Sequence, residues 1–300
     1  MSLSNNMENL NIKKDITIIL VLFKETLELV SQTLSSLQFF KVIIIDNGND
    51  EKLKKKIEDQ FVIEKYILNK KNTGFSAGYN QGIKLSKTDF TLVLGPDCLI
   101  QQKDILTLKK KLSENKDCFL VSATSYDHNG NLTYTGGPLP ENGEKNIVLD
   151  ISGDTCVESI LGACMFFKTK DIIQNQLFFD EKFFLYYSDD DLCRRVRKLN
   201  KTIIQIYDAK CIHQHGILKI KNIFIRKFVR EYNLKFDKFY YFYKIDKHQE
   251  VMNSFKKKIP SFILKFFVKI FSLNFLKAIE IYSQIFAYYR FRFKILKKDT

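Results

Sequence analysis

Strand-like and helix-like patterns of hydrophobic residues alternate along the first hundred residues of this 300-residue chain. Continuous apolar runs predict strands, and apolar residues at helical spacing predict helices between them. The predicted strands are residues 16–23, 42–45, 66–68 and 90–94, and the predicted helices are residues 26–37, 51–61 and 75–85. Strands that are apolar throughout are typical of a sheet buried on both faces. We therefore expect an α/β fold, in which helices cover both faces of a mostly parallel sheet.

The pattern changes in the later parts of the chain. Residues 127–154 are rich in Gly, Asn, Pro and Asp, which indicates a loop excursion, and residues 202–207 form another strand-like run. Between Ser261 and Lys277, polar residues recur near the helical period and the rest is mostly Phe, Ile, Leu and Val. This predicts an amphipathic helix with a stripe of lysines, which interrupt it too often for a transmembrane span.

The charge is divided unevenly between two parts of the chain. Residues 218–300 hold 20 Lys and Arg against 6 Asp and Glu, which accounts for the whole net charge of +14. Such asymmetry indicates two parts with different partners. We predict an α/β domain over residues 1–217 and a basic, aromatic-rich helical region over residues 218–300.

The cysteines and the first apolar run bear on the cellular compartment. Six cysteines are scattered through apolar stretches without a CxxC pair, which argues against a zinc site and against a disulfide scaffold. The run at 16–23 is short, is closed by Lys24 and Glu25, and has no small-residue cleavage site, so we expect a strand there and no secretory signal. A reducing cytoplasm fits these features.

Carboxylates follow two of the predicted strands. Asp46 comes directly after the second run, and Asp97 comes shortly after the fourth. Ligands of open α/β sheets bind beyond the carboxyl ends of the strands, so both residues are candidates for one site. A carboxylate like Asp97 can hold Mg²⁺ together with substrate phosphates, although Pro96–Asp97 is also ordinary turn chemistry.

Three adjacent aspartates, Asp189–Asp191, are the sharpest chemical signal in the sequence. One of them could act as a general base, while another caps the helix that begins there.

Two weaker features accompany these carboxylates. The turn at Asn72–Asn80 could approach a phosphate or a ribose, but its glycines do not form a GxGxxG pattern, and close helix packing is the alternative. His213 and His215 alternate along a strand or turn, so one of them could face a metal or a phosphate.

Taken in order, these segments resemble the family-2 glycosyltransferases, and among them the bacterial rhamnosyltransferases of polysaccharide assembly. The resemblance spans residues 16–216. The motifs that carry it are Ile18–Lys24, Ile45–Asp46–Asn47, Asn72-x-Gly74, Asn80-x-Gly82-Ile83, Pro96–Asp97, Gly162–Met165, Phe179–Glu181, Phe184-x-Tyr186-x-Ser188 through Leu192, and His213. Two positions depart from the family, namely Gly95 where Asn is frequent and Ser188 where Glu is frequent.

The resemblance implies a GT-A fold, a Rossmann-like and mostly parallel sheet with helices on both faces, for a catalytic domain over residues 1–217. It also implies an inverting enzyme that moves a sugar from a nucleoside-diphosphate donor to a hydroxyl of a saccharide or lipid-linked saccharide, in bacterial surface polysaccharide assembly. Mg²⁺ or Mn²⁺ would be the cofactor. The expected donor is dTDP-rhamnose, and a UDP-hexose or UDP-N-acetylhexosamine is the alternative.

The resemblance also implies a role for each matching residue. Asp189 would be the general base, with Asp190 as the fallback because of Ser188, and Asp191 would support them. Asp97 and His213 would bind the metal. The nucleotide and donor sugar would be bound by Phe23, Asp46, Asn72, Gly74 and Asn80.

The basic tail suits anionic lipid headgroups, near which each surface lysine contributes about 1 kcal/mol. We expect a cytoplasmic enzyme in peripheral contact with the inner face of the membrane, and a helical bundle packed on the catalytic domain is the alternative for the tail.

Two other classes of function fit the sequence less well. A nucleotidyltransferase would carry a Gly-rich signature, and residues 16–28 contain no glycine. A non-catalytic protein could bind a ligand, a membrane or nucleic acid. We expect no nucleic acid, because apolar helical periodicity fits a membrane or a partner surface better.

Overall fold

The computed structural model describes two compact units and covers residues 15–144, 147–214 and 220–296. The first unit comprises the chain up to Glu181 and then continues from Ser188 to the end of the last strand. The second unit comprises Lys182–Tyr187 and the three long helices near the C-terminus. A short stretch of the second unit is thus inserted into the sequence of the first, which a single boundary at residue 217 does not foresee.

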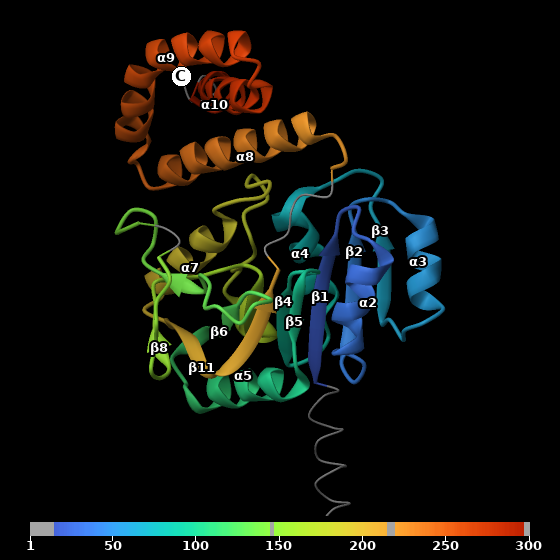
Figure 1. Ribbon diagram of the computed structural model, residues 1–300. Coiled ribbons are helices and arrows are strands. Elements are labelled where there is room, and N and C mark those ends of the chain that lie inside the picture. The colour runs from blue at the N-terminus through green and yellow to red at the C-terminus, as the bar shows by residue number, and fades with distance from the viewer. Residues whose placement is uncertain (1–14, 145–146, 215–219, 297–300) are drawn as a thin grey trace, which may run out of the picture. The chain divides into compact units, whose positions relative to one another are not determined.

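One large sheet forms the centre of the first unit, with the strand order β3-β2-β1-β4-β10-β6-β11-β5 and β8 beside β11 (Figure 1). Its strands are β1 Ile16–Leu22, β2 Lys41–Asp46, β3 Lys65–Leu68, β4 Phe90–Leu94, β5 Cys98–Ile100, β6 Cys118–Tyr126, β8 Thr155–Cys156, β10 Cys164–Lys168 and β11 Thr202–His213. Strands β3, β2, β1 and β4 are parallel, and β10 joins β4 to β6 in the antiparallel sense. The four strands predicted in the first hundred residues are confirmed to within one residue at each end.

Helices cover both faces of this sheet. Both faces of β1 are apolar, and each is buried against a different set of helices. The helices of the first unit are α2 Leu27–Ser35, α3 Glu51–Glu58, α4 Gly74–Leu85, α5 Gln102–Glu114, α6 Thr169–Gln174 and α7 Ser188–Lys198. Ile18 and Leu20 of β1 lie in one core cluster with residues of α2, α3 and α5. Ile19, which points the other way, lies in a second cluster with residues of α4, α6 and α7. The predicted α/β fold with helices on both faces is therefore confirmed.

The glycines of α4 are packing positions. A Cβ on Gly82 would lie 2.3 Å from a methyl carbon of Ile19, and one on Gly78 would lie 2.8 Å from Val21. Since Ile19 and Val21 belong to β1, these glycines let the helix approach the sheet closely. Helix packing is therefore the role that the structure gives to these two glycines.

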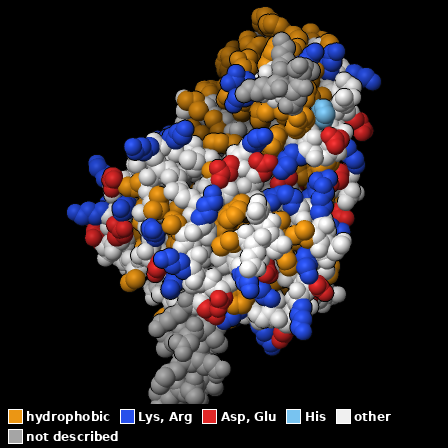
Figure 2. Space-filling view, turned by 180° about the vertical axis from the view of Figure 1, so that it is seen from behind, with side chains coloured by type: hydrophobic (Ala, Val, Ile, Leu, Met, Phe, Trp, Pro, Cys, Tyr) orange, Lys and Arg blue, Asp and Glu red, His pale blue; other side chains and the backbone are white. Residues whose placement is uncertain are grey.

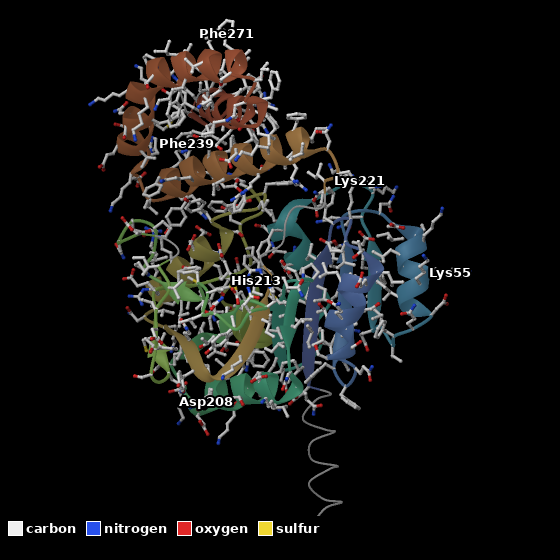
Figure 3. The ribbon with its side chains drawn as sticks, viewed as in Figure 1. Lys55, Asp208, His213, Lys221, Phe239 and Phe271 are labelled. Carbon is white, nitrogen blue, oxygen red and sulfur yellow. The ribbon has the colours of Figure 1, made fainter. Side chains whose placement is uncertain are left out.

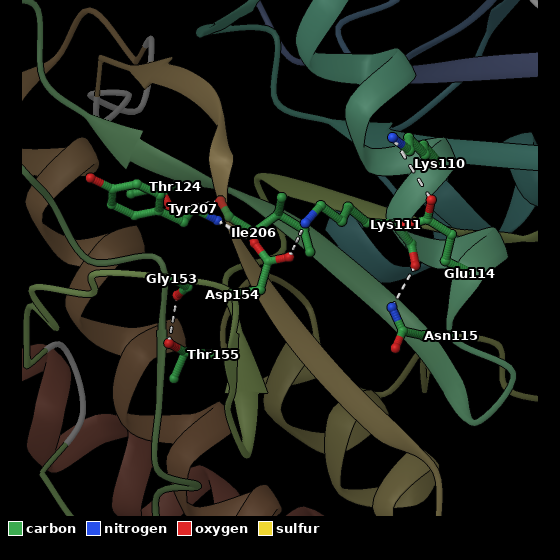
Figure 4. A network of polar contacts seen from close by, with 10 residues as sticks. All are labelled: Lys110, Lys111, Glu114, Asn115, Thr124, Gly153, Asp154, Thr155, Ile206 and Tyr207. Atoms are coloured by element: carbon green, nitrogen blue, oxygen red, sulfur yellow. Dashed lines mark hydrogen bonds and ion pairs between the residues drawn. The ribbon is translucent and has the colours of Figure 1, made fainter.

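Strand β11 is longer than the predicted run at residues 202–207, because it bulges and continues. Its pairing with the parallel strand β6 shifts register between Ile206 and Lys210. Backbone groups freed at the bulge find partners: Lys210 N donates to Asp104, and Tyr207 N donates to Asp154, which also pairs with Lys111 of α5 (Figure 4). The continuation beyond the bulge carries the strand to His213.

The second unit contains α8 Ile223–Lys244, α9 His248–Phe271 and α10 Phe275–Lys294. Their shared core is aromatic, with Phe239, Phe255 and Phe291 among its most buried side chains (Figure 3 labels Phe239). Within the part of the chain that the structure describes, no helix is both long and apolar enough to cross a membrane.

The prediction of one continuous helix from Ser261 to Lys277 is wrong. Helix α9 ends at Phe271, Leu273 has a positive φ of 57°, and α10 begins at Phe275. Asn274 N donates to the carbonyl of Lys269, which closes α9, and the Asn274 side chain caps Lys277 N of the next helix. The apolar periodicity continues across the break, so it could not reveal the turn.

The inserted segment Lys182–Tyr187 is held by α8. Asp237 is fully buried, and its carboxylate accepts hydrogen bonds from the backbone N–H groups of Leu185 at 3.0 Å and Tyr186 at 2.9 Å. Burial raises the pKa of Asp237 to about 6, although these bonds favour the charged form. The next residue after this segment is Ser188, the first of α7.

Candidate functional site

Asp97 and His213 are brought together by the pairing of β5 with the extended end of β11. Cys98 is the register partner of His213, and Gln214 N donates to the backbone carbonyl of Asp97. His213 Nε2 lies 3.6 Å from Asp97 Oδ2, and the Cys98 thiol lies within 4.8 Å of both ligand atoms (Figure 3 labels His213). A carboxylate and an imidazole at this separation suit a shared divalent cation. The other candidate histidine, His215, lies outside the described residues.

The three adjacent aspartates lie in the first turn of α7, but their carboxylates have different surroundings. Asp190 is 1% exposed and accepts a hydrogen bond from the Ser159 hydroxyl at 2.8 Å. Asp191 is 2% exposed and forms an ion pair with Arg195 at 2.9 Å, one turn later. Asp189 is the most exposed of the three at 9%.

Asp189 is connected to the Asp97 region through one short loop. Gly162 N donates to Asp189 Oδ2 at 3.0 Å. The next residue, Ala163, accepts a hydrogen bond at its carbonyl from Gly95 N at 2.8 Å, two positions before Asp97. A Cβ on Gly162 would lie 2.7 Å from the ring of Phe75 and 3.3 Å from the Cβ of Asp189, so the loop needs glycine there. Backbone hydrogen bonds of two consecutive residues, Gly162 and Ala163, therefore connect α7 to the turn that carries Asp97.

The carboxylate of Asp46 is buried at the end of β2. It accepts hydrogen bonds from Gly48 N at 2.6 Å, Asp50 N at 3.2 Å and the Tyr66 hydroxyl at 3.2 Å. Burial raises the pKa of Asp46, and these three bonds oppose the rise. The carboxylate that is predicted to bind the nucleotide therefore fixes the turn after β2.

Asn47 joins this turn to the start of α4. Its Nδ2 donates to the carbonyl of Gly74 at 3.0 Å, and its Oδ1 accepts from the Thr73 hydroxyl and from Asn69, each at 2.9 Å. The side chain of Asn72 accepts from Gly74 N at 2.9 Å, at the positive φ of Gly74. The predicted nucleotide-binding residues Asn72 and Gly74 therefore share one network with the end of β2, and Asn47 was not foreseen as its centre.

Glu25 is a second site residue that the sequence reasoning missed. It follows β1, and its carboxylate accepts a hydrogen bond from the backbone N–H of Phe23. Burial, with smaller contributions from the charges of Asp97 and Asp46, raises the pKa of Glu25 to about 7, although backbone N–H groups oppose the rise. Its place just after a strand end, like that of Asp46, is the signal that could have identified it.

Asn80 is committed to contacts within the protein. Its Oδ1 accepts from Phe179 N at 2.9 Å, and its Nδ2 donates to Phe179 O at 2.8 Å and to Glu181 at 3.0 Å. Both amide hydrogens are thus used. Asn80 connects α4 to the segment that leads toward the aspartates, and donor binding by this residue stays a prediction.

Comparisons with known proteins agree with this architecture. The family model described as glycosyl transferase family 2 matches residues 17–172. A curated relative, the low-salt glycan biosynthesis hexosyltransferase Agl10 of Haloferax volcanii, is 24% identical over 216 residues, which is 68% of each chain.

Two solved structures share the fold at 11% identity each. A mannosyltransferase from Pyrobaculum calidifontis, in complex with GDP-Man and Mn²⁺, matches with a TM-score of 0.53 over 94% of this chain and 88% of its own. GalNAc-T7, solved with UDP, GalNAc and Mn²⁺, matches with a TM-score of 0.56. The match covers 67% of this chain but only 44% of GalNAc-T7. The family match covers more than half of the chain, so the protein belongs to glycosyl transferase family 2 and is a glycosyltransferase with a GT-A-like fold.

Proposed function

We propose that this enzyme is an inverting, metal-dependent transferase that uses a nucleoside-diphosphate sugar. The observation that carries the proposal is the loop at Gly162–Ala163. The N–H of Gly162 donates to Asp189, and the carbonyl of Ala163 accepts from Gly95 N in the turn before Asp97. This loop gives a candidate base and a candidate metal ligand one rigid support. Such a pair is what a displacement at a sugar carbon requires.

Asp189 is the residue that we assign as the general base. Its neighbours Asp190 and Asp191 are more deeply buried and are engaged by Ser159 and Arg195. Asp189 takes the proton of the acceptor hydroxyl as that oxygen forms a bond to the anomeric carbon. The bond from this carbon to the diphosphate oxygen breaks, and its electron pair leaves with the nucleoside diphosphate. Attack from the opposite face inverts the anomeric centre.

Asp97 and His213 are the residues that would hold a divalent cation, Mg²⁺ or Mn²⁺. The cation would act as a Lewis acid toward the charge on the departing diphosphate. The nearby Cys98 is fully buried and its pKa is raised, above all by burial, so an oxygen and nitrogen ligand pair is the donor set that we assign.

The residues that would bind the nucleotide are Phe23, Asp46, Asn72 and Gly74. The network centred on Asn47 supports this assignment, since it fixes the backbone that a base or ribose would contact. The resemblance to rhamnosyltransferases favours dTDP-rhamnose as the donor. The hexosyltransferase relative and the solved neighbours with UDP, GalNAc or GDP-Man keep UDP-hexose and UDP-N-acetylhexosamine as alternatives.

The test is a donor panel with purified full-length protein. Release of nucleoside diphosphate from dTDP-, UDP- and GDP-sugars is measured with Mg²⁺ or Mn²⁺, with and without EDTA. We expect release from one donor that EDTA and Asp97→Ala both abolish. The proposal fails if no donor is hydrolysed or transferred and no nucleotide with metal raises the thermal midpoint.

We also propose that the second unit contacts an anionic membrane from the cytoplasmic side, where a lipid-linked saccharide acceptor would be found. Around the turn between α9 and α10, Leu264, Phe271 and Leu273 are 68%, 82% and 74% exposed (Figure 3 labels Phe271). Hydrophobic side chains gather over the C-terminal helices in Figure 2, with Lys and Arg around them. Residues 261–279 contain lysines but no Asp or Glu. Exposed apolar side chains ringed by positive charge are what an anionic bilayer surface binds.

A further inference from the structure

A pocket of about 260 Å³ in the second unit is lined by three lysines. Lys235 and Lys238 lie one turn apart on α8, and Lys258 faces them from α9. On α9, Glu250, Ser254 and Lys258 follow one another at intervals of four residues, which places them along one helix face. Phe239 and Phe255 form apolar parts of the lining.

Among the described residues, the acidic groups that accompany the lysines of this pocket are Glu231 and Glu250. Lys235 lies over the ring of Phe255 and Lys238 over that of Phe242, but none of the three ammonium groups forms an ion pair or hydrogen bond among the residues that the structure describes. Burial, followed by the neighbouring charges of Lys238 and Lys258, lowers the pKa of Lys235 to about 8, and Glu231 only partly opposes this. Glu250 lines the same pocket, and its carboxylate would repel an anion bound there.

Lys235 and Lys238 are half-buried, whereas Lys258 is exposed. Placing half-buried lysines beside a third one is costly unless an anion compensates them, because desolvation and mutual repulsion both disfavour the charged forms. Lysines bind phosphate as point charges, and the Ser254 hydroxyl could donate a hydrogen bond to the same oxygens. We propose that this pocket binds a phosphate or diphosphate group. The proposal goes beyond the transferase function, since it concerns a site in the other unit and its test needs no turnover.

The experiment measures binding of inorganic pyrophosphate by calorimetry in EDTA, so that metal-dependent binding near Asp97 is absent. The test variant is Lys235→Gln combined with Lys238→Gln, and the matched control is Lys256→Gln combined with Lys257→Gln. The control removes two exposed lysines of α9 that do not line the pocket. We expect the test variant to bind pyrophosphate at least tenfold more weakly than wild type, and the control to stay within twofold.

A second arm distinguishes a lipid phosphate from a soluble one. Vesicles of phosphatidylcholine with phosphatidic acid, whose headgroup is a phosphate monoester, are compared with vesicles containing phosphatidylglycerol, whose headgroup is a diester. Tighter binding to phosphatidic acid that is lost only in the test variant identifies the ligand as a lipid phosphate. Pyrophosphate binding that depends on the pair, without that preference, identifies a soluble phosphate compound.

Equal losses in the test and control variants would overturn the proposal, because the lysines would then act only through general charge. Wild type that neither binds pyrophosphate nor prefers vesicles with phosphatidic acid would overturn it as well. The test variant should keep or raise the thermal midpoint, since it removes two charges that burial disfavours. If it does not fold, Lys258→Gln, at an exposed position, is measured in the same assays against Lys257→Gln. A loss of less than threefold relative to that control then rejects the pocket.

Discussion

At the residue scale, the three adjacent aspartates show how one helical turn gives identical side chains different chemistry. Asp190 and Asp191 are fixed by Ser159 and Arg195, whereas the partners of Asp189 among the described residues are the backbone N–H groups of Gly162 and Asp190. Backbone donors orient a carboxylate without neutralising it with a positive side chain. The Asp191–Arg195 pair is four residues apart and follows from helical spacing. The contacts of Asp189 and Asp190 could not be predicted from the sequence, because Ser159 and Gly162 approach α7 only through the tertiary fold.

The first prediction compares two of these aspartates. Asp189→Asn should lower kcat by about 10²–10⁴-fold, since the amide cannot take the acceptor proton, while the donor Kd changes little. Asp190→Asn keeps an oxygen that can accept the Ser159 hydrogen bond and should lose less than tenfold. Kinetics with the donor found in the panel, together with calorimetric titration of the nucleotide, measure both. The opposite ranking of the two variants would make Asp190 the base.

The second prediction concerns Glu25 and the pH dependence of stability. The folded protein raises the pKa of Glu25 from 4.5 to about 7. The protonated form is therefore favoured by folding, and this contribution is complete below pH 4.5 and is lost as pH rises through 7. Glu25→Gln removes the loss, so the variant should be more stable than wild type at pH 8 by on the order of 2 kcal/mol and equally stable near pH 4.5.

Denaturant unfolding in EDTA from pH 4.5 to pH 8 measures this difference. The matched control is Glu28→Gln, an exposed position in the first turn of α2. If the free energies of unfolding of Glu25→Gln and wild type change equally with pH, folding does not raise the pKa of Glu25.

At the element scale, the strands and helices of the first hundred residues follow from local sequence patterns, whereas several later elements do not. Strands β1 to β4 could be predicted because their apolar runs are unbroken and end at polar turns. Strand β6 was not predicted, although it is buried along nearly its whole length, because Ser122, Thr124 and Ser125 interrupt its apolar pattern. The bulge in β11 and the break between α9 and α10 depend on tertiary partners and on one residue with positive φ, which periodicity does not encode.

The segment before α7 gives the third prediction. Asp237→Asn keeps one oxygen for Leu185 N and Tyr186 N, but its NH₂ replaces the oxygen that faces Phe184 N, and a neutral amide is a weaker acceptor than a carboxylate. We therefore expect a stability loss of about 1–3 kcal/mol and faster amide exchange at Leu185 and Tyr186. Because this segment leads directly into the helix of Asp189, kcat should also fall, by roughly tenfold or less, with the donor KM unchanged. Here Asp237 acts as a positioning residue.

Thermal unfolding, hydrogen exchange and steady-state kinetics test these effects together. Asp246→Asn is the matched control, since Asp246 is exposed in the same unit and Asn tolerates its positive φ of 59°. A folded Asp237→Asn protein with unaltered kcat and faster exchange at Leu185 would separate this segment from catalysis.

At the scale of the whole molecule, the sequence divides its chemistry between two units. The neutral unit holds the candidate base, the candidate metal ligands and the residues proposed to bind the nucleotide, and the unit with the helices α8 to α10 holds the excess of positive charge. Charge asymmetry could be read from composition alone. The short stretch that the second unit takes from the middle of the chain could not, since only the contacts of Asp237 and the aromatic core assign it there.

The last prediction tests the membrane surface of the second unit. Leu264→Ser combined with Phe271→Ser removes two exposed apolar side chains, each of which would contribute on the order of 2 kcal/mol when buried in a bilayer interface. We expect at least tenfold weaker co-sedimentation with vesicles containing phosphatidylglycerol, at a thermal midpoint no lower than that of wild type. Phe39→Ser combined with Val62→Ser is the matched control, since these side chains are 57% and 94% exposed in the first unit.

Salt and lipid charge separate the two contributions to this binding. Raising the salt should weaken binding of wild type and of the Leu264/Phe271 variant alike, because the lysines remain in both. Neutral phosphatidylcholine vesicles should bind wild type much more weakly than anionic ones. Equal binding by wild type and the Leu264/Phe271 variant, or an equal loss in the Phe39/Val62 control, would mean that the exposed apolar turn between α9 and α10 does not enter the bilayer. The surface would then be open to a protein partner, and the lysines alone would account for any attraction to lipid.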